Sequence, residues 1–338
     1  MHKRVKAVYR TLFLLILPIL FFVITICIGR YEVSTYDVLK SLSSIITGNG
    51  ANVDLQIYSI LVNIRIPRAI QGLLVGASLA ASGACFQSVF RNPLVSSGML
   101  GVSSGAGFGA ALSILFFGAT VMTPVFSFSF GVLAVILSYL VGKVSGGSPT
   151  VTLLLGGQII QSIFSALLSI MKYLADTETQ LPAITFWLMG SLASTKQTDM
   201  LFSGVPMILG LIGMLLFRWR LNVLSMGDRE AKTLGLNVEV SKFAIISFAT
   251  LATAGAVSVS GVIGWVGLII PHICRMIFGN DNRVLIPASI SFGACFMVFV
   301  DTICRSMTSA EIPLGIVTAI VGGPFFIYLL KRTKGGVW

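Results

Sequence analysis

The stretch NPLVSSGMLGVSSGAGFGAALSILFFGATVMTPVFSFSFGVLAVILSYLVG, residues 92–142, decides the fold because it contains no Asp, Glu, Lys or Arg. A helix of a soluble domain shows water a polar face, whereas a helix that crosses a bilayer needs about 20 apolar residues. These 51 uncharged residues therefore predict two membrane-spanning helices.

Similar windows recur along the chain, which is 55% hydrophobic and only 10% charged, and this composition excludes an ordinary globular domain. The uncharged windows are 11–29, 69–90, 92–142, 144–171, 200–217, 243–274, 284–300 and 312–330. The window 243–274 is also long enough for two passes, the second one short. We therefore predict an all-α polytopic membrane protein with ten spans in one domain, residues 1–338. A further window, 179–195, predicts an interfacial segment with Trp187 at the headgroup level.

The net charge of +11 is explained by membrane orientation and not by a nucleic-acid partner. With ten passes and the N-terminus inside, 16 of the 23 Lys and Arg fall on the inner side, as the positive-inside rule requires. Both termini are then cytoplasmic. The first window, 11–29, lacks a small-residue cleavage site and is interpreted as a retained span.

The span interiors are almost without ionisable side chains; the nearest exceptions, Asp301, Arg305 and Glu311, cluster at an outer turn between the last two spans. A carrier working alone, or an intramembrane enzyme, usually carries such groups inside the bilayer. No catalytic set, metal site, cofactor site or Walker A loop is evident. If the chain transports uphill, we expect a separate chain to supply the energy.

Two segments are candidates for partner contacts. The inner segment 218–242 contains the charged run 227–235, which predicts a short amphipathic helix ended by Gly235 and suited to hold another protein. Arg65 and Arg68, at the outer mouth of the second span, could pair with carboxylates of a docking protein. The simpler interpretations are a solvated basic loop and the interfacial anchoring of a helix end.

Small residues are frequent in the spans. The pairs Gly72/Gly76, Gly101/Gly105 and Gly105/Gly109 have the spacing of close helix contacts, although a Gly- and Ser-lined solute path is an alternative. Residues 78–94 and 256–272 share small residues, a Ser-Gly pair and a final Pro, in spans expected to run in opposite directions. This is a weak sign of an inverted internal repeat.

An ordered set of motifs, from about residue 60 to 332, resembles the iron-complex and cobalamin (FecCD-type) permease family of ABC importers. The motifs are RIPR at 65–68, SGACFQSVFRNPL at 82–94, LGVSSGA at 100–106, LLLGG at 153–157, WLMGSL at 187–192, SGVIGWVGLIIPHICR at 260–275, DTICR at 301–305 and EIPLGIVTAIVGGPFFIYLLKR at 311–332.

The resemblance implies a type II ABC importer permease fold, in a bacterial or archaeal cytoplasmic membrane. It implies a homodimer with the pathway on the two-fold axis, two ATPase subunits inside and a solute-binding protein outside. It also implies three sets of site residues. The ATPase-coupling set is Gly227, Asp228, Glu230, Ala231, Leu234 and Gly235; the binding-protein docking set is Arg65, Arg68 and Arg305; the cytoplasmic gate is Asn92, Leu94, Thr150 and Val151.

The implied function is transport and not catalysis. The first hypothesis is import of a metal chelate, namely a ferric siderophore, haem or cobalamin. The second is import of a small oxyanion such as molybdate or tungstate through the same architecture. The sequence leaves both open, because selectivity would rest mostly on the binding protein.

Overall fold

The computed structural model describes residues 2–29, 33–47, 54–144, 149–195, 197–308 and 310–332, and over these ranges it contains helices and no strand. The all-α prediction is thus confirmed. The helices are α1 His2–Cys27, α2 Thr35–Thr47, α3 Leu55–Ile60, the π-helical turn η1 Leu61–Arg65, α4 Ile66–Phe90, α5 Val102–Phe117, α6 Met122–Val144, α7 Pro149–Leu174, α8 Gln180–Met189, α9 Gln197–Met226, α10 Asp228–Thr233, α11 Val238–Ser260, α12 Val266–Phe278, α13 Asn282–Met307 and α14 Leu314–Arg332.

Seven helical segments within the described ranges are long and apolar enough to cross a membrane, and three apolar helices are shorter. The shorter ones are α5, α12 and the part of α14 from Leu314 to Tyr328. The deciding stretch 92–142 indeed supplies two helices, α5 and α6, and 243–274 supplies α11 and the short α12. The segment predicted to be interfacial contains the ten-residue α8.

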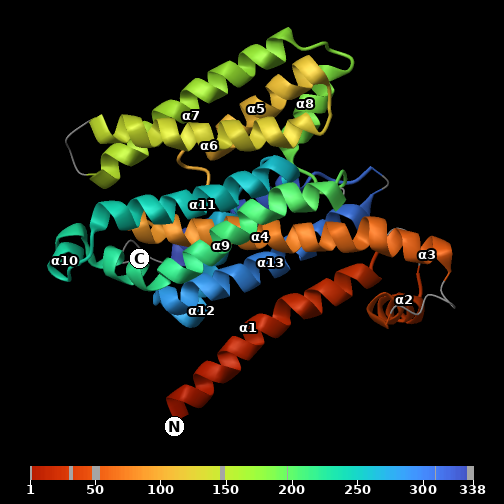
Figure 1. Cartoon of the computed structure of the whole chain (residues 1–338), viewed down its shortest axis with the longest axis horizontal. Helices are drawn as coiled ribbons and strands as arrows, with labels where there is room; N and C mark the ends of the chain where they lie inside the picture. The colour runs from red at the N-terminus through yellow and green to blue at the C-terminus, as the bar shows by residue number, and fades with distance from the viewer. Residues whose placement is uncertain are drawn as a thin grey trace.

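The helices form three groups (Figure 1). Helices α5 to α8 lie on one side, α4, α9, α11, α12 and α13 form the middle, and α1 and α2 lie on the other side. The middle group is more buried than α1 at the side. In the apolar window of Leu55–Phe90, 89% of the residues are buried, but in that of Val8–Cys27 only 17% are. Helix α1 begins toward the end of the molecule where α10 lies, whereas α2, α3 and α8 lie at the opposite end.

Glycines allow close helix contacts both in the middle group and in the group of α5 to α8. A Cβ added to Gly76 of α4 would lie 2.1 Å from the carbonyl oxygen of Gly293 in α13. Added to Gly105 of α5, it would lie 2.4 Å from the carbonyl oxygen of Phe130 in α6. No side chain fits at such distances, so the prediction that the glycine pairs serve helix packing is confirmed.

The two segments with similar sequences lie against each other. A Cβ on Gly83 of α4 would be 1.8 Å from the carbonyl oxygen of Gly267 in α12. Their conformations differ, because 78–90 is continuous helix, whereas α11 ends at Ser260 and a break with positive φ at Gly261 and Trp265 precedes α12. The inverted repeat stays a prediction.

Two expected helix boundaries are wrong. The second span does not begin near Arg65, because the helix runs on from Leu55 through η1; Arg65 and Arg68 therefore lie inside a helix and not at its end. The inner segment 218–242 is also mostly helical, since α9 continues to Met226 and α11 begins at Val238. Charged side chains end an uncharged window without ending the helix that carries them.

Candidate functional site

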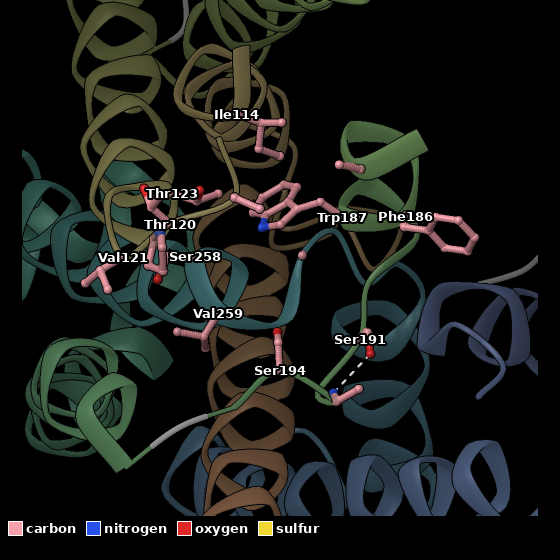
Figure 2. Close-up of a pocket in the computed structure, with 15 residues that line it drawn as sticks. Ile114, Thr120, Val121, Thr123, Phe186, Trp187, Ser191, Ser194, Ser258 and Val259 are labelled. Carbon is pink, nitrogen blue, oxygen red and sulfur yellow. Dashed lines mark hydrogen bonds between the residues drawn. The ribbon is translucent and has the colours of Figure 1, made fainter. Parts of the chain in front are cut away.

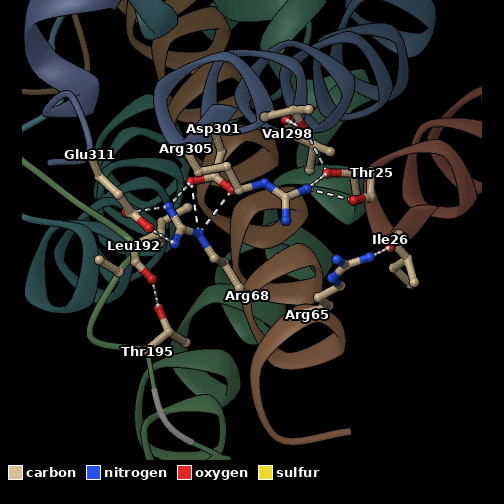
Figure 3. A network of polar contacts seen from close by, with 12 residues as sticks. Thr25, Ile26, Arg65, Arg68, Leu192, Thr195, Val298, Asp301, Arg305 and Glu311 are labelled. Atoms are coloured by element: carbon tan, nitrogen blue, oxygen red, sulfur yellow. Dashed lines mark hydrogen bonds and ion pairs between the residues drawn. The ribbon is translucent and has the colours of Figure 1, made fainter. Parts of the chain in front are cut away.

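Arg68 is the centre of an ion-pair network at the end of the molecule near α2 and α3 (Figure 3). Its Nε lies 3.1 and 3.0 Å from the two carboxylate oxygens of Asp301, and its Nη2 lies 2.8 Å from Asp301 Oδ1. The same guanidinium binds Glu311 with both Nη atoms, at 2.9 and 2.8 Å. Arg68 is only 8% exposed and Asp301 3%, so the network joins α4, α13 and the α13–α14 connection in a buried place.

The other two arginines of this region hold the C-terminal end of α1. Arg305 donates through Nη2 to the hydroxyl of Thr25 at 2.7 Å and to the Thr25 carbonyl, and Arg65 donates through Nη1 to the carbonyl of Ile26 at 2.7 Å. The last carbonyls of a helix lack partners within the helix and carry a partial negative charge. Two cations from other elements therefore cap α1, and a hydroxyl pair between Thr25 and Thr302 at 2.6 Å supports the contact.

The structure thus brings the predicted docking residues Arg65, Arg68 and Arg305 together, and it gives each of them acceptors within the chain. Their docking role stays a prediction. An outside carboxylate would have to replace one of these acceptors. The most accessible is Glu311, whose side chain is 29% exposed against 4% for Asp301.

The predicted amphipathic helix at the opposite end is α10, and its termination at Gly235 is confirmed. Gly235 has φ +79°; its N–H donates to the carbonyl of Lys232, and the N–H of Leu236 donates to that of Ala231. This pair of bonds is the Schellman arrangement that ends a helix with glycine in the left-handed conformation. Gly227 precedes the helix with φ +133°, also in the region that favours glycine.

The six predicted coupling residues differ in what a partner could reach. Ala231 is completely buried and anchors α10 on the protein, while Leu234 is 62% exposed and Glu230 is exposed. Asp228 is half-buried, and its carboxylate lies 2.7 Å from Nζ of Lys242 in α11. A partner could therefore touch Leu234 and Glu230 but not Ala231, and the coupling role of all six residues stays a prediction. No pattern in the sequence pointed to Lys242, and the prediction omitted it.

The predicted gate residues lie on two segments. The side chain of Asn92 accepts from the N–H of Leu94 at 2.9 Å, which turns the chain after α4. Thr150 is buried at the beginning of α7 and its hydroxyl accepts from Lys242 at 3.0 Å, whereas Val151 is 55% exposed. Of these residues, Leu94 lines a cavity of about 370 Å³. The cavity is completed by Ser96, Gly98, Met99, Ser103, Ser104, Gln158, Gln161 and Leu268.

A larger cavity, about 660 Å³, opens at the other end between α5, α6, α8 and the end of α11. Trp187 of α8 and Ile114 of α5 line it together with the hydroxyls of Thr120 and Ser258 (Figure 2). None of the described lining residues of either cavity is ionisable. Both cavities therefore offer hydroxyl, amide and apolar surface, with no charged side chain to hold an ion.

Helix α7 carries an exposed polar stripe that begins with Gln158 at the smaller cavity. Gln158, Ser162, Ser165 and Ser169 are all exposed and follow each other at steps of four, three and four residues, which places them on one helix face. The neighbouring face exposes Ile159 and Ile163. An exposed amide on a membrane-spanning helix is costly in lipid, so the stripe points to a place where water or protein covers it.

The described residues contain no group of three or more His, Cys, Asp or Glu that could hold a metal ion. Arrangements for nucleophilic or acid–base chemistry are also not evident in the two cavities, whose lining is neutral. The described residues thus present an arginine network at one end, α10 at the other end, and two separate cavities with neutral linings.

Known membrane permeases resemble this chain over most of its length. The model of the FecCD transport family matches residues 15–332. The molybdate import system permease protein MolB of Haemophilus influenzae is 40% identical over 317 residues, covering 93% of each chain. A protein of Helicobacter pylori with the name "Probable iron chelatin transport system permease protein" is 38% identical over 82% of this chain and 83% of its own.

A solved structure described as an inward-facing, metal-chelate type ABC transporter is 37% identical, with a TM-score of 0.84 over 95% of this chain and 98% of the other. The family model covers the arginine network, α10 and the residues that line both cavities, so the motifs of the sequence and the fold point to one assignment. The chain belongs to the FecCD transport family.

Proposed function

We propose that the chain is the membrane-spanning permease subunit of an ATP-driven ABC importer. The observation that carries the proposal is α10, which a fully buried Ala231 fixes to the protein while its other face presents Arg229, Glu230, Lys232 and Leu234 to a partner. The chain has no Walker A loop. A separate ATPase would bind this face.

In this proposal the three shorter apolar helices join the seven long ones to make ten passes. Both termini and α10 then lie on the cytoplasmic side of a bacterial or archaeal cytoplasmic membrane. The start of α1 and helix α10 lie toward one end of the molecule. This position and the basic character of the inner segments support the orientation.

The working unit is a homodimer in which the polar stripe of α7 faces the solute path. The stripe lies on an exposed face of one chain, and a path between two copies would give its hydroxyls and amide a wet environment. Asn92, Leu94, Thr150 and Val151 would form the cytoplasmic gate, a role supported by the position of Leu94 at the smaller cavity.

At the outer end, a solute-binding protein docks on the arginine network through acidic side chains. Arg65, Arg68 and Arg305 supply the positive charge, and Glu311 is the internal acceptor that an incoming carboxylate would replace on Arg68. Bidentate geometry supports this exchange, because the two Nη atoms that face Glu311 match any other carboxylate equally well.

The solute is a metal chelate: a ferric siderophore, haem or cobalamin. The neutral lining of both cavities suits a bulky chelate that is passed on without being held tightly. Molybdate is the second candidate, favoured by the 40% identity with MolB over 93% of both chains.

The test is ATP hydrolysis by the chain reconstituted in liposomes with the ATPase encoded beside it. Rates are compared with and without the adjacent binding protein, loaded in turn with haem, cobalamin, ferric siderophores and molybdate. Stimulation by one loaded form supports the three-part importer and names the solute. Failure to assemble with an ATPase, together with flux that needs no ATP, would reject the proposal.

A further inference from the structure

Lys242 joins two elements that do not follow each other in the chain. It lies in the second turn of α11, with 8% exposure, and its ammonium group is 2.7 Å from Oδ2 of Asp228 and 3.0 Å from Oγ1 of Thr150. Asp228 is the first residue of α10, and Thr150 is the second residue of α7. One side chain thus binds the proposed ATPase-docking helix and the inner end of the helix with the polar stripe.

The burial of Lys242 distinguishes it from the other basic residues at this end. Arg218, Arg220, Arg229 and Lys232 are exposed, so their charges stay in contact with water or with a partner. A buried ammonium loses its hydration and is stabilised only by acceptors that replace the water. Its partners here are one carboxylate and one hydroxyl, so a displacement of either removes part of the stabilisation.

The two elements that Lys242 connects pack against different helices. Helix α10 packs on α9 and α11, whereas α7 packs on α5 and α6. The two elements therefore belong to different groups of the fold, the middle group and the group of α5 to α8 (Figure 1). A lysine has three donors on a flexible stem and can keep two acceptors while the elements shift relative to each other.

We propose that Lys242 transmits the displacement of α10 to the cytoplasmic end of α7, which makes it a positioning residue of the transport cycle. The inference rests on the proposed function, since the movement of α10 comes from a bound ATPase. When α10 moves, Asp228 draws the ammonium group with it, and the ammonium group draws the Thr150 hydroxyl and the first turn of α7. The adjacent Val151, 55% exposed, reports that movement.

The experiment uses the full chain carrying Val151→Cys, assembled with its ATPase in liposomes and treated with a water-soluble maleimide. The parent chain corrects for the native cysteines, of which Cys85, Cys274, Cys295 and Cys304 are buried. The labelling rate is measured without nucleotide and with Mg-ATP and vanadate. We expect nucleotide to change this rate severalfold, and Lys242→Met to remove most of the change while ATPase binding and ATP hydrolysis persist. Lys143→Met, the same substitution at an exposed lysine at this end of α6, keeps the change.

A double-mutant cycle tests the same link without altering Lys242. Asp228→Asn and Thr150→Val each weaken one contact of the ammonium group. Because both act through one residue, the double variant should lose little more of the nucleotide effect than the worse single variant. Independent, additive losses would overturn the proposal.

The outcomes separate the two proposals. A parent chain that assembles with no ATPase rejects the importer, and the role of Lys242 falls with it. An assembled complex that hydrolyses ATP but shows no change at Val151→Cys, or the same change with Lys242→Met, rejects only the transmission by Lys242. A Lys242→Met chain with lower thermal stability and equal losses of assembly, hydrolysis and response shows a purely structural role and also overturns it.

Discussion

At the scale of single residues, the carboxylates around Arg68 determine which substitutions can test docking. Arg68 is bound by two carboxylates that come from positions 301 and 311, on one helix and the connection after it. A buried ion pair adds little stability over apolar packing, but removing one partner leaves an uncompensated charge that costs about 3–5 kcal/mol. Substitutions at Arg68 or Asp301 therefore mix stability with docking, and a cleaner test of docking uses Glu311.

Glu311→Gln should strengthen docking of the binding protein. The change removes the charge that competes for Arg68, while the buried pair with Asp301 remains. We expect the Kd to fall about tenfold, the equivalent of one weakened charge-assisted hydrogen bond, when binding is measured on the permease in nanodiscs. The matched control is Glu239→Gln in the first turn of α11, an exposed glutamate at the opposite end. An unchanged or higher Kd for Glu311→Gln would argue against exchange at Arg68.

At the scale of elements, the six-residue α10 and its C-cap Leu234 combine an anchored side and a free side. The anchor is Ala231, whose methyl group is fully enclosed. The free side includes Leu234, which is 62% exposed. Such a helix can transmit the movement of a bound partner only while Ala231 stays packed. Substitutions on the two sides should therefore differ in their effects on permease stability and on partner binding.

Ala231→Leu and Leu234→Asp should separate anchoring from binding. The first overpacks an enclosed site and should lower the stability of the isolated permease by about 1–3 kcal/mol, as well as the yield of ATPase complex. The second should leave the melting temperature of the permease unchanged and lower only the yield of the complex. Both quantities are measured by thermal unfolding and co-purification. If Leu234→Asp retains the full amount of ATPase, the exposed side of α10 is not the docking face.

The polar stripe of α7 makes a second prediction at this scale. Ser162→Cys should react with a water-soluble thiol reagent in liposomes, because its face would line a wet path. Ile163→Cys is the matched control, since it is equally a surface position of the single chain, 50% exposed, but lies on the apolar face. We expect labelling of the first to exceed that of the second by about tenfold or more, given the exclusion of water from the hydrocarbon core. Equal labelling of both would show that the stripe does not face water.

At the scale of the whole molecule, the sequence predicted the helical class and most of the apolar windows that became helices. It could do so because lipid demands uncharged stretches of sufficient length. It misplaced the beginning of the second span, since Arg65 and Arg68 interrupt the window while the helix continues. It recognised Gly235 as a helix end, because a local backbone conformation favours that residue.

The contacts that build the arginine network and position α10 could not be predicted from the sequence. Arg68 meets Asp301 and Glu311 from 233 and 243 positions away, and Lys242 meets Thr150 from 92 positions away. Only the packing of the helices brings such residues together. The opposite orientation of Ala231 and Leu234 on α10 depends in the same way on how the helix sits on α9 and α11.

The network around Arg68 also bears on how the chain is made. Synthesis proceeds from the N-terminus, so α1 and α4 enter the membrane long before Asp301 and Glu311 exist. Until then, the charge of Arg68 has no carboxylate from this network, and α1 has only one of its two cationic caps. A ribosome-stalled chain ending before residue 301 should therefore be degraded by membrane proteases much faster than one ending after residue 320, and Arg68→Leu should reduce the difference. Pulse-chase labelling in cells measures the lifetimes of the two chains. Equal lifetimes would show that the contacts of Asp301 and Glu311 with Arg68 do not protect the chain from degradation. If the lifetimes differ as expected, translation of the last helices completes the contacts that hold α1 and α4, and it protects the chain from membrane proteases.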